Sequence, residues 1–583
     1  MSSSKTTYEF GPFRIDLERY LLLRGDEAIA LSPKVFETLL FLVKHRAEVA
    51  KKDDIINSIW PDTFVEEGNL AQNIFLLRKA LGEEKNEHRY IVTIPGLGYR
   101  FVAPVEETAA TQVPQPETVA RTVGSIAVLP FKNLAGDDND KFLGPGLADA
   151  LIMRLSSIRN LKVRPTAAVL KFINLREEPL AIGLELNVDA LLDGVYQRET
   201  DTIRVSVQLV SVKDGVTLWA AKFDEKLTDI FTIQDSISEQ VVRSLALKLS
   251  GDERRQLKES YTLNPEAFQL FVKGRYFWNQ RTTEGLKKAL DYAQQAIAID
   301  PTYAPAYVGL ADTYNLLGAQ HSVMAPRDSF PKARAAALRA LEIDEKLAEA
   351  YASLGFIKFC FEWNWQAAEQ SYLRAIELKP NYATAHHWFG ELLSSVGRFD
   401  EAYDELLLAQ ELDPLSLAIN VDTAACFYYS RQYAQSERQI VNLLELNSNF
   451  IRAYMLLGKV QEQAGEPAKA VETLKRAVEL SGEDPVTMST LAHALATAGE
   501  RDEALRILAD LQDSSGSRYV SACSIAAIHI ALGNADRAFV SLEEAYENRD
   551  IELVWLKVNP VFDPLRSDPR FVNLARRVNP SLI

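Results

Sequence analysis

Residues 69–82, NLAQNIFLLRKALG, place amide and cationic side chains on a segment with helical periodicity. Leu70, Ile74, Leu77 and Leu81 recur at i, i+4, i+7 and i+11, so they share one face of a helix. The side chains expected to face outward, with Arg78 at the flank, are Asn69, Gln72, Asn73, Leu76 and Lys79. Amides can pair with the adenine edge, and cations with guanine or phosphate. The pattern predicts a helix that contacts DNA; the alternative is a solvated helix face.

Three flanking segments are expected to position this helix. Apolar runs broken by turn residues between Tyr8 and Leu31 predict a small antiparallel sheet. Two helices should follow, over residues 33–46 and 52–60, the second stopped by Pro61. Beyond the candidate helix, YIVTI and GYRFV flank a glycine-rich turn at 95–98 and predict a β-hairpin able to project as a wing.

Residues 8–104 resemble the OmpR/PhoB-type winged helix family through SPKVFETLLFLV, DDIINSIW, NLAQNIFLLRKALG and YIVTIPGLGYRF. The resemblance implies that the third helix enters the major groove while the wing reaches the backbone or minor groove. It places Asn69, Arg78 and Thr93 where backbone or base contacts are usual. Trp60 matches a position that can approach the backbone, although an aromatic residue ending a helix is more often part of a core.

The sequence departs from the family pattern on this predicted surface. Phe75 and Leu76 occupy positions that are often polar or basic in relatives, and Pro95 replaces a residue that is a cation in some of them. Arg100 remains available for a phosphate. The expected DNA-binding residues are Asn69, Gln72, Asn73, Leu76, Arg78, Lys79, Thr93, Arg100 and Trp60.

Net charge argues against indiscriminate binding of nucleic acid, because the formal charge of the chain is −16. Residues 1–105 carry 14 Lys and Arg against 15 Asp and Glu, so the acidity belongs mostly to the later domains. Since Arg78 and Lys79 are the cations of the predicted recognition helix, one copy should bind DNA modestly. We therefore expect double-stranded DNA to be occupied by a homodimer or higher oligomer.

A linker and a mixed domain are expected after the winged helix of residues 1–105. Residues 106–123 mix Pro, Thr, Ala and Glu without core periodicity and are interpreted as the linker. Residues 124–255 predict a small α/β domain, with a strand at SIAVLPF, a helix at about 145–157 and strands at DALLDGVYQRE, TIRVSVQLVSV and TLWAAKFDEKL. Through IAVLPFKNLAGD, GLADAL and VDALLDGVYQR this domain resembles the N-terminal part of TolB-type proteins.

Residues 262–583 predict an all-α array of repeats with a C-terminal cap. Small residues recur at intervals of 34 in two series, which are Gly390, Ala424, Gly458, Ala492 and Ala526, and Ala402, Ser436, Ala470, Ala504 and Ala538. The segments RFDEAYDELLLAQELDP and EPAKAVETLKRAVEL resemble tetratricopeptide repeats, of which about eight are expected. Such a solenoid has a concave groove in which a protein partner can dock.

No catalytic residue, cofactor or metal site is expected, so the chain is not interpreted as an enzyme. The three cysteines show no metal-binding spacing and suit helix cores. A nucleotide cyclase hidden in residues 124–250 would need metal-binding carboxylates, and no known pattern of them is present. The segment MSSSKTTYEF lacks the apolar core of a secretory signal, and no apolar run approaches the roughly 18 residues of a membrane span. We expect a cytoplasmic protein without a membrane contact.

Together these features predict a multidomain, one-component transcriptional regulator. Its winged helix would bind promoter DNA, and its repeat array would bind a protein partner or mediate self-association. The alternative is a repeat scaffold for protein interactions whose winged helix does not read DNA specifically.

Overall fold

The computed structural model describes residues 6–16, 21–25, 27–29, 31, 33–46, 48–59, 67–83, 89–94, 97–109, 123–134, 143–173, 178–199, 202–226, 230–245, 247, 264–319, 324–514 and 519–579. The chain divides into two compact units. The N-terminal unit comprises residues 1–122 with 211–216, and the C-terminal unit comprises residues 123–210 with 217–583.

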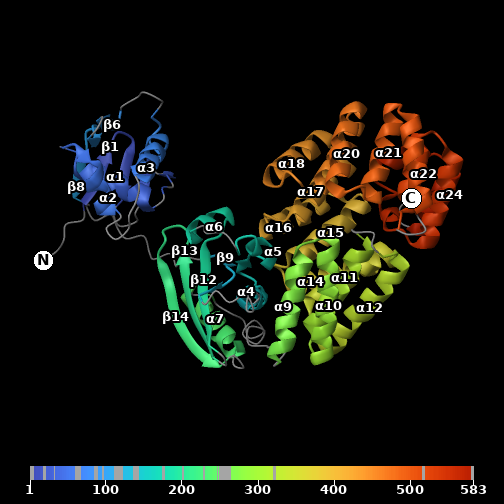
Figure 1. Ribbon diagram of the computed structural model, residues 1–583, viewed down its shortest axis with the longest axis horizontal. Coiled ribbons are helices and arrows are strands. Elements are labelled where there is room, and N and C mark those ends of the chain that lie inside the picture. The colour runs from blue at the N-terminus through green and yellow to red at the C-terminus, as the bar shows by residue number, and fades with distance from the viewer. Residues whose placement is uncertain are drawn as a thin grey trace. The chain divides into compact units, whose positions relative to one another are not determined.

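The described residues of the N-terminal unit form two antiparallel sheets and three helices (Figure 1). Its strands are β1 (Thr6–Phe10), β2 (Phe13–Asp16), β3 (Leu21–Arg24), β4 (Glu27–Ile29), β5 (Ala50–Lys51), β6 (Ile91–Ile94), β7 (Gly98–Phe101) and β8 (Glu106–Ala109). Its helices are α1 (Pro33–Lys44), α2 (Lys52–Ile59) and α3 (Glu67–Ala80). The sheet orders are β4-β3-β2-β1-β8 and β5-β7-β6. These elements confirm the predicted order of strands, three helices and wing hairpin.

Strand β8 corrects the start of the expected linker. Residues 106–109 were assigned to the linker, but they pair antiparallel with β1, with Tyr8 opposite Glu107. The sequence EETA has no apolar alternation, so the pattern gave no strand signal, and the pairing is made by backbone hydrogen bonds to β1. The first domain therefore extends to Ala109. Residues 110–122 and Trp60 lie outside the described residues.

The core of the N-terminal unit joins the wing to the first sheet. Leu70, Ile74, Leu77 and Leu81 are all buried, which confirms the predicted inward face of α3. Phe10 packs edge-to-face on Phe101 of the wing, with ring centroids 5.0 Å apart. At the start of β7, a Cβ on Gly98 would lie 2.0 Å from the Ala50 carbonyl oxygen, so only glycine permits this strand pairing.

The middle domain of the C-terminal unit is a mixed sheet covered by helices. Its strands are β9 (Ser125–Val128), β10 (Lys132–Asn133), β11 (Lys162–Val163), β12 (Ala190–Glu199), β13 (Thr202–Ser211) and β14 (Thr217–Lys226). The main order is β11-β9-β12-β13-β14, in which β9 runs parallel to β11 and β12 and β13 runs antiparallel to β14. Its helices are α4 (Leu143–Leu155), α5 (Thr166–Leu170), α6 (Pro179–Glu185) and α7 (Ile230–Ser244).

The repeat array forms eight helix pairs within residues 264–514 and 519–548. The pairs are α9 (Pro265–Asn279) and α10 (Thr283–Ile299), α11 (Ala304–Ala319) and α12 (Pro326–Ile343), α13 (Ala348–Ile357) and α14 (Trp365–Leu378), α15 (Ala383–Ser395) and α16 (Phe399–Leu412), α17 (Leu417–Tyr429) and α18 (Tyr433–Leu446), α19 (Ile451–Gln463) and α20 (Pro467–Ser481), α21 (Pro485–Ala498) and α22 (Arg501–Ser514), and α23 (Ala522–Ala531) and α24 (Ala535–Asn548). A π-helical turn, η3 (Lys358–Glu362), follows α13. The predicted number of repeats is confirmed.

The small residues of the 34-residue series lie where paired helices approach each other. A Cβ on Gly390 would lie 2.6 Å from Leu406 Cγ, and a Cβ on Gly458 would lie 2.5 Å from Leu474 Cγ. At Ser436 the hydroxyl donates a hydrogen bond to the Ala424 carbonyl across the same kind of contact. Close approach of the helix backbones therefore explains the repeat signature.

We expect Gly458→Ala to lower the free energy of unfolding by about 1 to 3 kcal/mol, because the added methyl group overpacks a buried leucine. Urea titration followed by circular dichroism measures this change. The matched control is Gly309→Ala in α11, where the added Cβ finds only an ordinary contact at 3.8 Å from Phe271. There the helix propensity of alanine should stabilise the protein by up to about 1 kcal/mol. Equal effects of the two substitutions would contradict the packing explanation.

The C-terminal cap folds back onto earlier repeats. It consists of η4 (Ile551–Trp555), η5 (Pro560–Leu565) and α25 (Pro569–Val578). Trp555 stacks on Tyr429 of the fifth helix pair, with ring centroids 4.4 Å apart and planes at 13°, and it meets Phe359 of η3 edge-on at 6.4 Å. The Arg431 guanidinium pairs with Asp563 at 2.9 Å. Through these contacts the cap connects the end of the array back to the third and fifth repeats.

The first helix pair is covered by the middle domain. Helix α4 lies beside α9 (Figure 1), and Ala150 packs with Phe268, Phe271 and Val272 in one buried cluster. Further along the array, Asn381 Nδ2 donates to the carbonyls of Ile158, Arg159 and Leu161. None of the helices in the described ranges combines the length and hydropathy that a bilayer crossing requires.

Candidate nucleic-acid interface

Helix α3 presents an apolar and a cationic group to solvent. Phe75 is 60% exposed and Leu76 is 38% exposed, and Lys79 is exposed on the same side of the helix. The backbone of Asn69 and Gln72 lies in α3, but their side chains are outside the described part of the structure. The exposed surface therefore includes two of the predicted contact residues, Leu76 and Lys79.

Asn73 does not face outward as predicted. Its side chain is buried, at 9% exposure, and its Nδ2 donates a hydrogen bond of 3.1 Å to Thr38 Oγ1 of α1. With about 100° per residue, Asn73 lies only about 40° from Leu77 around the helix, which is the edge of the apolar face. The amide thus fixes α3 against α1 and is turned away from the exposed surface.

Arg78 and Thr93, two predicted contact residues, bind each other. One guanidinium nitrogen of Arg78, Nη2, donates to the Ile91 carbonyl at 3.0 Å and to Thr93 Oγ1 at 2.9 Å. Glu83 completes the link, because its Oε1 accepts from the backbone N–H groups of Tyr90 and Ile91 while its Oε2 lies 3.5 Å from Arg78 Nε. These contacts join the C-terminal end of α3 to the first strand of the wing.

The wing exposes a second cation beside its apolar tip. Arg100 and Thr93 are both exposed, on β7 and β6, and Leu97 at the turn is 53% exposed. The turn of the wing is anchored, because the backbone N–H of Lys52 donates to the Leu97 carbonyl. Sequence reasoning missed Glu83, although a glutamate directly after the helix-ending Gly82 could have indicated a partner for Arg78.

The repeat array surrounds a cavity of about 1280 Å³. Its wall includes residues from the middle domain, such as Met153 and Thr166, and from repeats throughout the array. The aromatic residues that the sequence concentrates in the early repeats mainly pack between helices: Phe271, Trp278, Phe359, Trp363, Trp388 and Phe389 are buried. All three cysteines are buried in the array, as expected for core residues.

Ionisable groups on the cavity wall are strongly affected by burial. Arg281 lies over the Trp278 ring, with its guanidinium carbon 3.6 Å from the ring centroid, and burial lowers the pKa of Arg281 to about 10. Burial raises the pKa of Asp413, which also lines the cavity, to about 7, although the charge of Arg164 opposes the change. A wall with buried charges of both signs suits a polar ligand rather than a purely apolar one.

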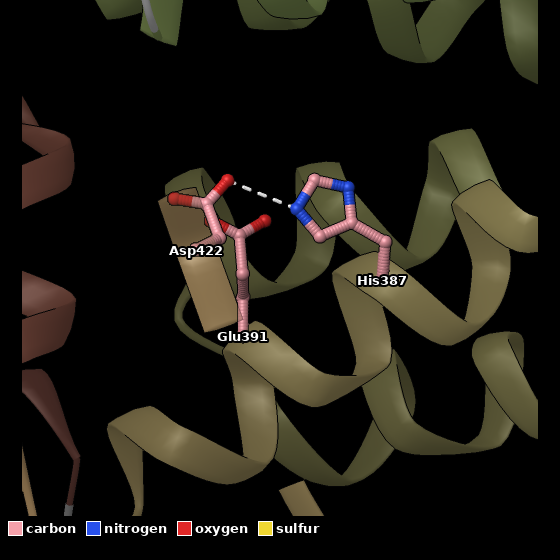
Figure 2. A group of neighbouring side chains, drawn as sticks. All are labelled: His387, Glu391 and Asp422. Carbon is pink, nitrogen blue, oxygen red and sulfur yellow. Dashed lines mark hydrogen bonds and ion pairs between the residues drawn. The ribbon is translucent and has the colours of Figure 1, made fainter. Parts of the chain in front are cut away.

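Three further cavity residues form a group that sequence reasoning missed. His387 and Glu391 lie on α15 and Asp422 on α17, and Figure 2 shows their side chains converging. The His387 Nε2 atom is 2.9 Å from Asp422 Oδ2. The sequence signal that could have indicated them is a histidine and a glutamate four residues apart, hence on one helix face.

Arg164 joins the middle domain to the repeat array by capping two helices at once. It is 3% exposed and donates to the Leu186 and Asn187 carbonyls, at the C-terminal end of α6, at 2.8 and 2.7 Å. Its Nη1 donates to the Glu411 and Leu412 carbonyls at the end of α16. Carbonyls at helix ends lack partners within their own helix, so Arg164 satisfies both ends.

Comparison with known families identifies three segments. Residues 26–101 match the family described as transcriptional regulatory protein, C terminal. Residues 121–240 match the second domain of HilA/YgeH-like transcriptional regulators, and residues 461–522 match the tetratricopeptide repeat. The matches confirm the predicted winged helix and repeats and relate the middle domain to HilA; its resemblance to TolB-type proteins stays a prediction.

Individual relatives are similar to different shares of the chain. The chain is 26% identical to transcriptional regulator HilA of Salmonella typhimurium over 429 residues, which cover 73% of this chain and 74% of the relative. It is 29% identical over 198 residues to a putative adenylate cyclase 3 of Rhizobium meliloti, covering 34% and 33% of the two chains. The solved DNA-binding domain of Escherichia coli CadC is 26% identical, with 18% of this chain and 98% of that chain covered and a TM-score of 0.17.

Proposed function

This chain combines an OmpR/PhoB-type winged helix, a HilA-like second domain and tetratricopeptide repeats, and from that combination we propose a one-component transcriptional regulator that binds promoter DNA. The observation that supports the proposal most directly is the exposed surface of α3 and the wing. Lys79 and Arg100 present cations there. Cations that neutralise phosphates supply most of the affinity of such domains for DNA.

These contacts lead us to propose a separate role in DNA binding for each residue. Lys79 and Arg100 would bind phosphates, and Leu76 would contact a thymine methyl group. Asn69 and Gln72, by their positions on α3, would read base edges. Arg78 and Thr93 would hold the wing in place relative to α3, so that both elements meet the duplex together. Trp60 would approach the DNA backbone, as the family resemblance implies.

We expect the DNA affinity of the full chain to fall steeply with salt concentration. Each phosphate contact adds roughly −0.9 to the slope of log affinity against log salt, so Lys79→Ala and Arg100→Ala should each make the slope about 0.9 less steep. Fluorescence anisotropy with fragments selected from a random DNA pool measures this. Arg14→Ala, which removes an exposed cation of β2, serves as the control and should leave the slope unchanged. Unchanged slopes for all three variants would contradict the proposed interface.

The alternative function is a protein-interaction scaffold in which the winged helix does not read DNA specifically. The 60% exposure of Phe75 beside Leu76 favours it, because exposed apolar groups of this kind occur at protein contacts. If the folded chain selects no DNA sequence, and Phe75→Ser abolishes a contact with another protein, the scaffold is the better description.

Whether the chain is a DNA-binding regulator or a scaffold, its regulatory partner would bind to the repeat array. Its cavity of about 1280 Å³ is lined from the first helix pair to the last, and such arrays bind extended segments of other proteins. We propose that a protein partner, or a second copy of this chain, binds there and adjusts occupancy of the promoter. Sedimentation of the full chain with and without DNA separates self-association from recruitment of a different protein.

A further inference from the structure

The group formed by His387, Glu391 and Asp422 has the composition of a metal site. One nitrogen or oxygen atom from each residue lies within 4.8 Å of the others (Figure 2). His387 and Glu391 are one helical turn apart on α15, so their side chains extend in the same direction. Asp422 reaches them from α17, the first helix of the following repeat. The arrangement brings together one imidazole and two carboxylates.

The carboxylates of Asp422 and Glu391 differ in their hydrogen-bond partners. Asp422 accepts from Arg452 at 2.6 Å through Oδ1 and faces His387 through Oδ2. The Oε2 atom of Glu391 is buried and has no hydrogen-bond partner within the described residues. A buried carboxylate oxygen without a partner is destabilising, and a bound cation would satisfy it.

We propose that His387, Glu391 and Asp422 bind one divalent transition-metal ion, for which Zn²⁺ is the best match. Imidazole is a poor ligand for Mg²⁺ and Ca²⁺ but a common one for Zn²⁺, which also accepts carboxylate oxygens. Metal–ligand bonds of about 2.0 to 2.2 Å require only small side-chain adjustments from the separations observed. Arg452 would stay on Asp422 Oδ1 and orient that carboxylate, as partners of metal ligands commonly do.

The ion would have an open position facing the cavity. All three ligands line the cavity wall, and three protein ligands leave one site of a tetrahedral zinc ion for water or for a further oxygen. A carboxylate or carbonyl group of a bound protein segment could occupy it. The metal would therefore be part of the surface that a cavity ligand meets.

The test is metal binding by the full chain after treatment with a chelator. Isothermal titration with Zn²⁺ should show one site lost in Glu391→Gln, a substitution that preserves shape and removes an oxygen with no protein partner. Removal of a residue that only orients a metal ligand weakens metal binding by roughly 10- to 100-fold. Because Glu391 would itself be a ligand, its loss should weaken Zn²⁺ binding by more than this. Zn²⁺ should also raise the melting temperature of the wild type and not of this variant.

Glu462→Gln is the matched control. Glu462 pairs with His493 at 3.0 Å in a similarly buried histidine–carboxylate contact of the array, and no third ligand belongs to that pair among the described residues. This variant should bind the same number of zinc ions as the wild type, and Co²⁺ in both should give the visible absorption of a tetrahedral site. Equal stoichiometry in Glu391→Gln and wild type, or no zinc bound by the wild type, overturns the proposal.

Discussion

Replacing Arg164 by methionine is expected to lower the free energy of unfolding of the C-terminal unit by about 3 to 5 kcal/mol. Methionine fills similar space but donates no hydrogen bond, so four carbonyls at the ends of α6 and α16 lose their donor. Two of the four hydrogen bonds are fully buried, and each buried polar group left without a partner costs roughly 1 to 3 kcal/mol. Urea unfolding of the full chain, followed by tryptophan fluorescence, measures the loss.

Lys162→Met is the control for Arg164. Lys162 lies two residues away and pairs with the side chain of Glu411, the residue whose carbonyl Arg164 caps, but the two partners are 42% and 55% exposed. Exposed pairs contribute at most about 1 kcal/mol, so this variant should unfold almost like the wild type. Similar unfolding curves for both variants would mean that Arg164 does not hold the middle domain on the array.

The second large effect is a dependence of stability on pH that originates at Asp413. This residue follows α16 and lies beside Arg164; its Oδ1 has no hydrogen-bond partner within the described residues. Burial raises the pKa of Asp413 to about 7, although the charge of Arg164 opposes the change. The folded protein therefore holds a proton that the unfolded chain releases near pH 4.

Stability contributed by this proton is fully present below about pH 4 and is lost as the pH rises to about 7. At 1.36 kcal/mol per pKa unit, the loss amounts to at most roughly 4 kcal/mol. Asp413→Asn removes the ionisation, so the variant should become more stable than the wild type above pH 7 and lose that advantage by pH 4 to 5. Free energies of unfolding at six values between pH 4.5 and 8 test this, and a constant difference between the two proteins would contradict it.

The two residues should be coupled. Without Arg164, the carboxylate of Asp413 loses its nearest compensating charge, so the destabilisation by Arg164→Met should grow as the pH rises. The double variant with Asp413→Asn should then lose less stability at pH 8 than the sum of the single effects implies. If the changes in the free energy of unfolding caused by the two substitutions simply add at every pH, the two side chains do not interact.

The parts of the fold that sequence predicted are those with a local periodic signal. The spacing of Leu70, Ile74, Leu77 and Leu81 defined the buried face of α3, and the interval between Gly390 and Gly458 defined the repeats. Ile203, Val205, Val207 and Leu209 alternate along β13 with more polar residues, and all four are buried. Each signal arises because one face of an element must be covered.

The features that sequence did not predict depend on partners far away in the chain. Asn73 is buried because Thr38, 35 residues earlier, meets it at the edge of the apolar face. Arg164 is buried because carbonyls about 250 residues later receive its hydrogen bonds. A polar side chain has the same appearance in the sequence whether it meets solvent or a helix end. Only the folded arrangement distinguishes these two situations.

The return of the C-terminal cap to the third and fifth helix pairs limits how copies of this chain can associate. An open array of repeats ends in bare faces that resemble its internal interfaces, and such faces can stack head-to-tail into filaments. Here α4 covers the first pair, and the last pair is closed by residues that contact Tyr429 and Phe359. Stacking of arrays end to end is thereby blocked at both ends. Copies that associate on DNA would therefore have to use surfaces other than the two ends of the repeat array.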